Sequence, residues 1–140
     1  MTDITQTFKN YINQIDFYMN EELGEEGTSF FSMNVKTDNG ANIRIVVSFQ
    51  ENYPSADVYC FNVADINNPL KRDIALQHIN DVNNSYRYAK FHITSEGTVS
   101  ISTALDFGGG FDPEVIINHI RSLYTIADEQ YKSFMKIAWS

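Results

Sequence analysis

The chain is poor in cysteine, in basic residues and in long hydrophobic runs, and each shortage excludes a class of protein. Cys60 is the only cysteine among 140 residues, so no internal disulfide can form and a reducing compartment is expected. The first residues, MTDITQTFKNYINQI, lack the basic start and apolar run of a signal peptide. No apolar stretch approaches the roughly 20 residues that cross a bilayer. We therefore expect a cytoplasmic protein with no membrane partner.

Acidic residues outnumber basic ones, which weighs against nucleic acid as a partner. The chain carries 10 Lys and Arg against 18 Asp and Glu, a formal net charge of −8. Nucleic-acid binding draws most of its affinity from Lys and Arg. Lys71 and Arg72 form the only adjacent basic pair, and Asp73 follows them. An acidic surface is also a common way for a protein to stay in solution.

Apolar and aromatic residues are plentiful, and they fall into patterned segments. The composition is 43% hydrophobic and 14% aromatic, over a length that suits one domain spanning residues 1–140. The first segment has helical spacing, with Asp3 and Gln6 resembling an N-terminal capping box. We expect this helix to stop in the acidic, glycine-containing stretch 21–27. Its apolar positions are Ile4, Phe8, Tyr11, Ile12, Ile15, Tyr18 and Met19.

Three strands are expected next, over residues 28–36, 41–50 and 56–65. In the first two, apolar and polar residues alternate with the period of a half-buried strand. Between them, Asn39 and Gly40 suit a two-residue hairpin turn. Pro54 separates the second strand from the third, because proline has no place in a central ladder. The third strand is apolar on both faces.

A helix and a second hairpin follow. Asn68 can cap the helix and Pro69 suits its first turn, while the sequence NNS at 83–85 ends it. Its expected buried stripe consists of Ala75, Leu76, Ile79 and Val82. Residues 86–107 then alternate as two strands that turn at Glu96-Gly97.

The last segment predicts a helix of about 25 residues, because one continuous apolar face runs almost to the end of the sequence. Asp112 and Pro113 repeat the signal of a cap followed by proline. The positions on its face are Ile116, Ile120, Leu123, Ala127, Tyr131, Phe134 and Ala138. The order is thus α-β-β-β-α-β-β-α, an α+β fold with an antiparallel sheet of about five strands and helices packed on it.

The glycines at 108–110 raise the question of a phosphate-binding loop. A Walker loop needs Lys and Ser or Thr after its last glycine, but Phe111 and Asp112 follow here. A dinucleotide fingerprint needs spaced glycines inside a parallel strand–helix–strand unit. Asp112 would itself occupy the N–H groups at the start of the helix, and Glu114 adds a second negative charge. We therefore interpret the glycines as a structural corner.

No residue pattern predicts a catalytic, cofactor or metal site. The histidines at positions 78, 92 and 119 match no metal-binding spacing. Cys60 would need a base beside it to act as a nucleophile. The stretch 21–27 lacks the alternating ligands of a calcium loop, and nothing in the spacing of Asp65 and Asp106 requires that they pair. We expect no cofactor, no metal and no enzymatic activity.

A row of aromatic side chains predicts a protein-binding face instead. On the first arm of the second hairpin we place Tyr86, Tyr88 and His92 opposite Phe91, and the third strand adds Tyr59 and Phe61. A sheet covered by helices on one side only would expose these side chains, and exposed aromatic patches mark interfaces. The helices could instead cover both faces, or the chain could dimerise through this one, and we favour a homodimer.

The segment HINDVNNSYRYAKFHITSEGTVSISTALDF, with a long helix ending in YKSFMKIAW, resembles the YbjN family of small bacterial proteins. The shared pattern is a helix ending in an Asn-rich turn, an aromatic-Ala-Lys strand and a hairpin turning at an acidic residue and glycine. The resemblance implies a fold similar to type III secretion chaperones, which are small, acidic, cytoplasmic and often dimeric. It also implies a role in regulating sensory transduction, and it carries over no catalytic residue. The triple glycine departs from the family pattern.

These observations favour a non-catalytic, chaperone-like or regulatory module that binds a protein partner or itself. It would hold an extended or helical segment on its sheet face and an edge strand. One alternative is an immunity or antitoxin-like inhibitor whose acidic surface blocks a basic site. Another is a small-ligand-binding protein or an enzyme, which would require a pocket joining His78, His92 or Cys60 to a carboxylate.

Overall fold

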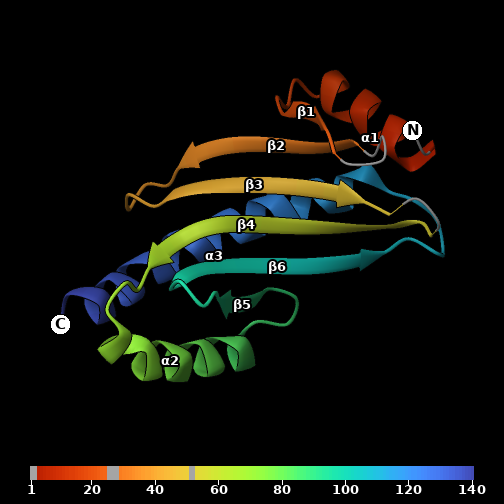
Figure 1. The fold of residues 1–140 in the computed structure, drawn as a ribbon. Helices are drawn as coiled ribbons and strands as arrows, with labels where there is room; N and C mark the ends of the chain where they lie inside the picture. The colour runs from red at the N-terminus through yellow and green to blue at the C-terminus, as the bar shows by residue number, and fades with distance from the viewer. Residues whose placement is uncertain (1–2, 25–28, 51–52) are drawn as a thin grey trace.

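An antiparallel sheet of six strands, with helices packed on it, organises the chain (Figure 1). The computed structural model describes residues 3–24, 29–50 and 53–140. In chain order, the elements are α1 (Asp3–Gln14), β1 (Asn20–Leu23), β2 (Ser29–Lys36), β3 (Asn42–Phe49), β4 (Ser55–Asp65), the 3-10 turn η2 (Pro69–Lys71), α2 (Arg72–Ser85), β5 (Lys90–Ile93), β6 (Thr98–Asp106) and α3 (Pro113–Trp139). This confirms the predicted α+β class, with six strands where about five were expected.

The strands lie side by side in the order β1-β2-β3-β4-β6-β5, and each neighbouring pair is antiparallel. The first four follow their sequence order. The chain then leaves through α2 and returns as β5 at the far edge, so β6 pairs with β4 on one side and with β5 on the other. Strand β4 is therefore central, and its Tyr59 lies opposite Val46 on β3 and Ser102 on β6.

The two predicted cap-and-proline signals both form caps, although the one at Asn68 opens a 3-10 turn and α2 itself begins at Arg72. The Asn68 side chain accepts a hydrogen bond of 3.0 Å from the Leu70 N–H, and Pro69 opens the turn. At α3, the Asp112 carboxylate accepts from the Glu114 N–H at 3.0 Å, and Pro113 is the first helical residue. Each proline stands where the backbone N–H would have had no partner inside the helix.

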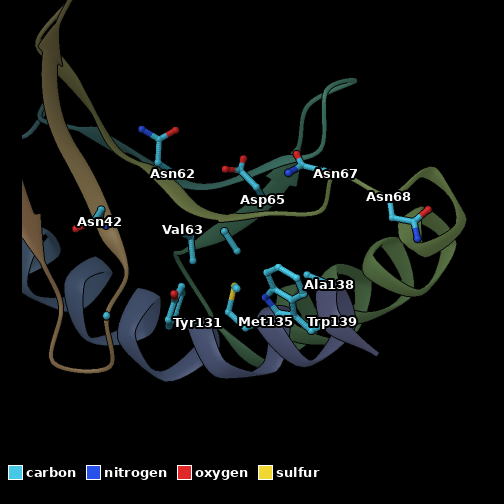
Figure 2. A pocket seen from close by; sticks show the side chains of 12 residues that line it. Asn42, Asn62, Val63, Asp65, Asn67, Asn68, Tyr131, Met135, Ala138 and Trp139 are labelled. Atoms are coloured by element: carbon cyan, nitrogen blue, oxygen red, sulfur yellow. The ribbon is translucent and has the colours of Figure 1, made fainter.

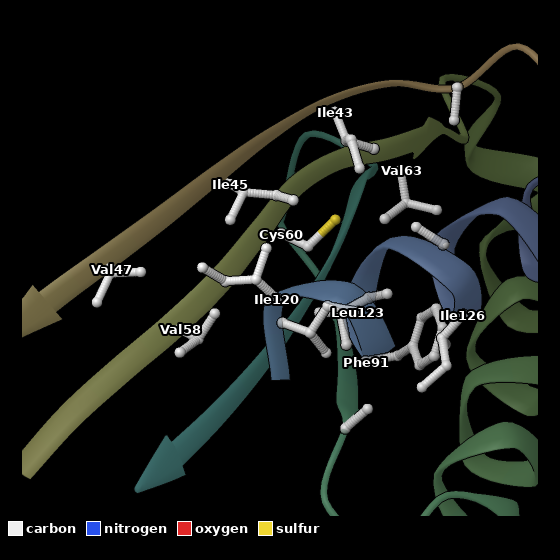
Figure 3. Close-up of a cluster of buried hydrophobic side chains, with 14 of the residues drawn as sticks. Ile43, Ile45, Val47, Val58, Cys60, Val63, Phe91, Ile120, Leu123 and Ile126 are labelled. Carbon is white, nitrogen blue, oxygen red and sulfur yellow. The ribbon is translucent and has the colours of Figure 1, made fainter. Parts of the chain in front are cut away.

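Helices α1 and α3 pack against one face of the sheet, with α3 crossing behind the strands in the view of Figure 1, and α2 lies along the edge of the sheet beyond β5. Phe8 of α1 lies 5.1 Å from Phe31 of β2, measured between ring centroids. Phe134 of α3 packs between α2 and β5. Its ring centroid lies 4.9 Å from that of His78 on α2 and 5.8 Å from that of Phe91 on β5. The central part of this core, between α3 and strands β3 and β4, is shown in Figure 3.

Helix α1 is shorter than the sequence predicts, and an additional strand follows it. The helix stops at Gln14 because Asp16 adopts a left-handed conformation (φ +56°), which breaks the helical path. The Phe17 N–H then bonds the Ile12 carbonyl at 2.9 Å, the pattern of a Schellman cap. Tyr18 and Met19 thus lie beyond the helix, and β1 occupies part of the stretch that we expected to form a turn.

Two smaller expectations are also corrected. The first hairpin turns through three residues, 38–40, rather than two: the Thr37 N–H bonds the Ala41 carbonyl, and the positive φ of +109° falls on Gly40 alone. On α2, Leu76 is 42% exposed, because Ala75, Ile79 and Val82 form the buried stripe without it.

Candidate binding surface

The second face of the sheet carries no described helix, and aromatic side chains occupy its centre. Tyr59 and Phe61 of β4 stack on each other there, with ring centroids 5.2 Å apart and planes 11° from parallel. Val46 lies beside Tyr59, and Phe30 of β2 belongs to the same face. We call these four side chains the aromatic centre. Burial, followed by the charge of Asp57, raises the pKa of the Tyr59 hydroxyl.

A polar cluster borders the aromatic centre on the same face. The Glu22 carboxylate of β1 accepts hydrogen bonds from the Ser32 hydroxyl at 2.6 Å and from the Arg44 guanidinium at 3.0 Å. The Ser32 bond, and the bond and charge of Arg44, lower the pKa of Glu22 against the opposing effect of desolvation. These contacts tie β1 through β2 to β3, and they leave the cluster with little net charge.

Of the five residues predicted to share a binding face, the structure places three on the uncovered face of the sheet and two elsewhere. Tyr59 and Phe61 lie together in the aromatic centre, and His92 is exposed on β5 of the same face. Tyr86 and Tyr88 do not join them, because β5 begins only at Lys90 and the chain before it bends toward α3.

The two displaced tyrosines both contact α3. The Tyr86 hydroxyl donates to Glu129 at 3.2 Å and accepts from the Gln130 amide at 3.2 Å. The Tyr88 ring meets His119 edge to face at 5.4 Å, and partial burial lowers the pKa of that imidazole. Both side chains thus belong to the helical layer.

The outer edge of the sheet at β5 is closed by one side chain of α2. The Asn83 amide nitrogen donates to the Phe91 carbonyl at 3.1 Å, and its oxygen accepts from the Phe91 N–H at 2.7 Å. Asn83 therefore satisfies the two backbone groups that a neighbouring strand would use. The Lys90 ammonium also folds back, to the carbonyls of Asn83 and Tyr86 at 2.8 and 2.7 Å. These contacts block strand addition at Phe91, in the middle of β5.

Comparison with protein families gives a match over residues 37–135, a span that runs from the turn before β3 into the last turns of α3. The matching family is YbjN, described as "Putative bacterial sensory transduction regulator". The chain belongs to the YbjN family. No curated protein matches it. That description names a regulator and no enzymatic activity, and the match includes β3 to β6 but leaves β1 and β2 outside.

In this YbjN chain the three glycines form the corner that the sequence predicts. The Gly108 N–H donates to the Asp106 carboxylate at 2.8 Å, and the Gly110 N–H bonds the Phe107 carbonyl at 3.0 Å. Asp112 takes the N–H of Glu114 at the start of α3. The N–H groups of Gly108, Gly110 and Glu114 are therefore already used, and two carboxylates flank the turn.

The side chains weighed as catalytic candidates in this YbjN chain lie apart. Cys60 has 0% exposure, and burial raises the pKa of its thiol to about 12. His78 bonds Gln130 at 2.9 Å. Asp65 and Asp106 lie at opposite ends of the ladder between β4 and β6.

Within residues 3–24, 29–50 and 53–140, the structure contains neither a cluster of metal ligands nor a helix that could span a membrane. No group of three or more His, Cys, Asp or Glu side chains there could hold a metal ion. None of the helices there has the length and apolarity to cross a membrane. The stretch 21–27, weighed above as a calcium loop, lies partly outside the described residues, and its Glu21 and Glu22 belong to β1.

Sequence reasoning missed Phe30, Val46 and Asn83 as members of the surface and its edge. The first two carry a readable signal: Phe30-Phe31 and Val46-Val47 break the alternation, so each pair places an apolar side chain on both faces of the sheet. Asn83 carries no such signal, because its role depends on how α2 docks beside β5.

Proposed function

We propose that this chain is a non-catalytic regulatory module that binds protein through the uncovered face of its sheet. The observation that supports this is the aromatic centre: the stacked rings of Tyr59 and Phe61, with Val46 and Phe30 on the same face, lie on the only face of the described sheet that lacks a helix. Aromatic residues are enriched in the cores of protein interfaces, and polar residues such as Glu22 and Arg44 form a suitable rim.

A second copy of the chain is the partner we favour. Two sheets can pack face to face about 10 Å apart, with their inner side chains interdigitated. A self-complementary patch with little net charge permits such contact in spite of the overall charge of −8. With the β5 edge blocked by Asn83, an extended partner segment would pair instead along β1, the other edge of the sheet.

Further parts of the proposal concern the whole chain. We take residues 1–140 as one domain, because the sheet and its helices share one hydrophobic core. We place the protein in the cytoplasm, where a lone buried thiol remains reduced. We also take the chain to have no catalytic role, since its nucleophile and its histidines lie apart.

Sedimentation velocity over a range of concentrations tests the proposed interface. The double variant Tyr59→Ser, Phe61→Ser should weaken self-association at least about tenfold, the loss of one or two interface hot spots. The matched control is Leu70→Ser, Tyr88→Ser, which removes two exposed apolar side chains that lie off this face. Equal association of the two variants, with native circular dichroism, would refute the assignment of the face. A wild-type chain that stays monomeric throughout would refute the choice of partner.

A further inference from the structure

The edge of the sheet on the side of β1 is stepped, because β1 has four residues and β2 has eight. Strand β1 pairs only with residues 29–32, whereas β2 continues to Lys36. In Figure 1, the end of β2 nearest the first hairpin extends past β1 with no described strand on its outer side. Residues 33–36 therefore pair with β3 on one side only. We call this segment the open half of β2.

The backbone of the open half presents hydrogen-bonding groups at this edge. Successive residues of a strand direct their N–H and carbonyl groups to alternate sides. The Thr37 N–H bonds the Ala41 carbonyl and so faces β3, as does every second residue before it, since the register of β2 with β3 is regular. Asn34 and Lys36 must then direct these groups toward the open side, where no described strand pairs with them. Two donors and two acceptors are therefore available to an extended chain.

The side chains of the open half differ between the two faces of the sheet. Met33 and Val35 lie on the helical side, half-buried and packed against the core. Asn34 and Lys36 are exposed on the uncovered face. An added strand would therefore place every second side chain beside apolar neighbours, and the side chains between them beside polar neighbours.

A hollow of about 300 Å³ adjoins the open half on the uncovered face. Lys36 lines it together with Asn62 of β4, whose side chain points away from Tyr131 of α3 (Figure 2). No acidic side chain is among the described residues of this lining. Arg44 also contributes, but its guanidinium is held by Glu22 at 3.0 Å, whereas Lys36 takes no part in the ion pairs of the described chain. Lys36 is therefore the cation available to a ligand here.

We propose that an extended segment of a partner protein adds to the sheet beside the open half of β2, in line with β1, with apolar side chains on the helical side and a carboxylate opposite Lys36. In strand addition, main-chain hydrogen bonds supply affinity and alternate side chains supply specificity. Opposite charges that face each other across two strands stabilise the pairing, and like charges weaken it. This inference rests on the proposed function of protein binding, and it uses no residue of the aromatic centre.

A palindromic peptide, acetyl-Val-Glu-Val-Glu-Val-amide, is the probe, because its side chains alternate in the same way in either direction. The matched control carries N-methyl groups on both Glu residues, which removes the donors that would face Asn34 and Lys36 but keeps the charge. We expect saturable shifts of the amide NMR signals of Asn34 and Lys36, and at least about tenfold weaker binding of the control, since two hydrogen bonds are lost. Equal binding of the two peptides, shifts confined to other strands, or no saturation up to about 10 mM overturns the proposal.

Lys36→Glu and Lys132→Glu form the matched pair of variants, because each exchanges an exposed lysine for a carboxylate and changes the net charge of −8 equally. Lys132 lies on α3, outside the hollow. Lys36→Glu should weaken binding of the peptide at least about threefold more than Lys132→Glu does, because an attractive cross-strand pair becomes a repulsive one. Equal affinities of the two variants overturn the role of Lys36. Should Lys36→Glu fail to fold, seen by circular dichroism, the comparison of the two peptides on the native chain decides.

The double variant Tyr59→Ser, Phe61→Ser separates this inference from the proposed self-association. It leaves the open half of β2 intact, so it should bind the peptide as the wild type does. A chain that binds the peptide but stays monomeric refutes only the choice of a second copy as partner of the aromatic centre. A chain that self-associates through that centre but does not bind the peptide refutes only the strand addition.

Discussion

Replacing Asn83 with alanine should open the edge of the sheet at β5. The side chain makes two hydrogen bonds to the backbone of Phe91, of 2.7 and 3.1 Å, and no strand lies beyond β5 in the described sheet. In the variant, the Phe91 N–H and carbonyl must be satisfied by water or by another chain. Free edges of this kind pair readily with strands of neighbouring molecules.

The expected loss of stability follows from those two bonds. Each buried or half-buried hydrogen bond contributes about 1 kcal/mol net, so Asn83→Ala should lower the free energy of unfolding by about 2 kcal/mol. Alanine also favours a helix more than asparagine does, by roughly 0.5 kcal/mol. Asn84→Ala gains the same helical preference at an exposed neighbouring position of α2, so the difference between the two variants isolates the edge contact.

Urea unfolding followed by circular dichroism measures the first effect, and light scattering at rising concentration measures the second. We expect Asn83→Ala to unfold at lower urea and to associate more than Asn84→Ala does. If the two variants unfold at the same urea concentration and scatter equally, Asn83 does not protect the edge and the reasoning fails.

Two further substitutions probe the turn and the polar cluster. Gly97→Ala should lower the free energy of unfolding by about 2 kcal/mol or more, because φ is +93° and a Cβ would lie 2.2 Å from the Ile66 carbonyl oxygen. The control is Gly109→Ala, which has open space around it and should leave the urea midpoint almost unchanged. Similar midpoints for the two variants would contradict this. For Glu22, whose pKa the hydrogen bond from Ser32 lowers in the folded chain, the stability contributed is present above the ordinary carboxyl pKa and is lost as pH falls through the lowered value. The difference in urea midpoint between wild type and Glu22→Gln should therefore shrink between pH 7 and pH 3, and a difference that stays constant would disprove the linkage.

Local signals in the sequence predict most of the fold. Asn68-Pro69 and Asp112-Pro113 mark helix starts whose cap bonds the structure contains. The alternation along β3 identifies its buried face, because successive side chains of a strand point to opposite faces of the sheet. These features depend on residues close together in the chain, so they can be read without knowing the fold.

Features that depend on distant contacts could not be predicted in this way. Asp16 ends α1 in a left-handed conformation usually taken by glycine, so the sequence placed the end of the helix at the glycines of the stretch 21–27 instead. Tyr86 and Tyr88 alternate with Lys90 like strand residues, but α3 draws them out of the sheet. The register of β4 against β6 shifts between Cys60 and Ala64, and no local pattern in the sequence predicts this irregularity.

The burial of Cys60 makes its thiol a natural probe of how often the core of this protein opens. The chain contains no other cysteine, and this thiol lies at 0% exposure on the central strand, under α3 (Figure 3). A thiol reagent can reach it only when β4 and α3 separate, so the rate of labelling reports how often the middle of the core opens. No engineered label is needed, and a ligand that binds only the folded chain will slow the reaction by the same factor by which it lowers the population of the open form.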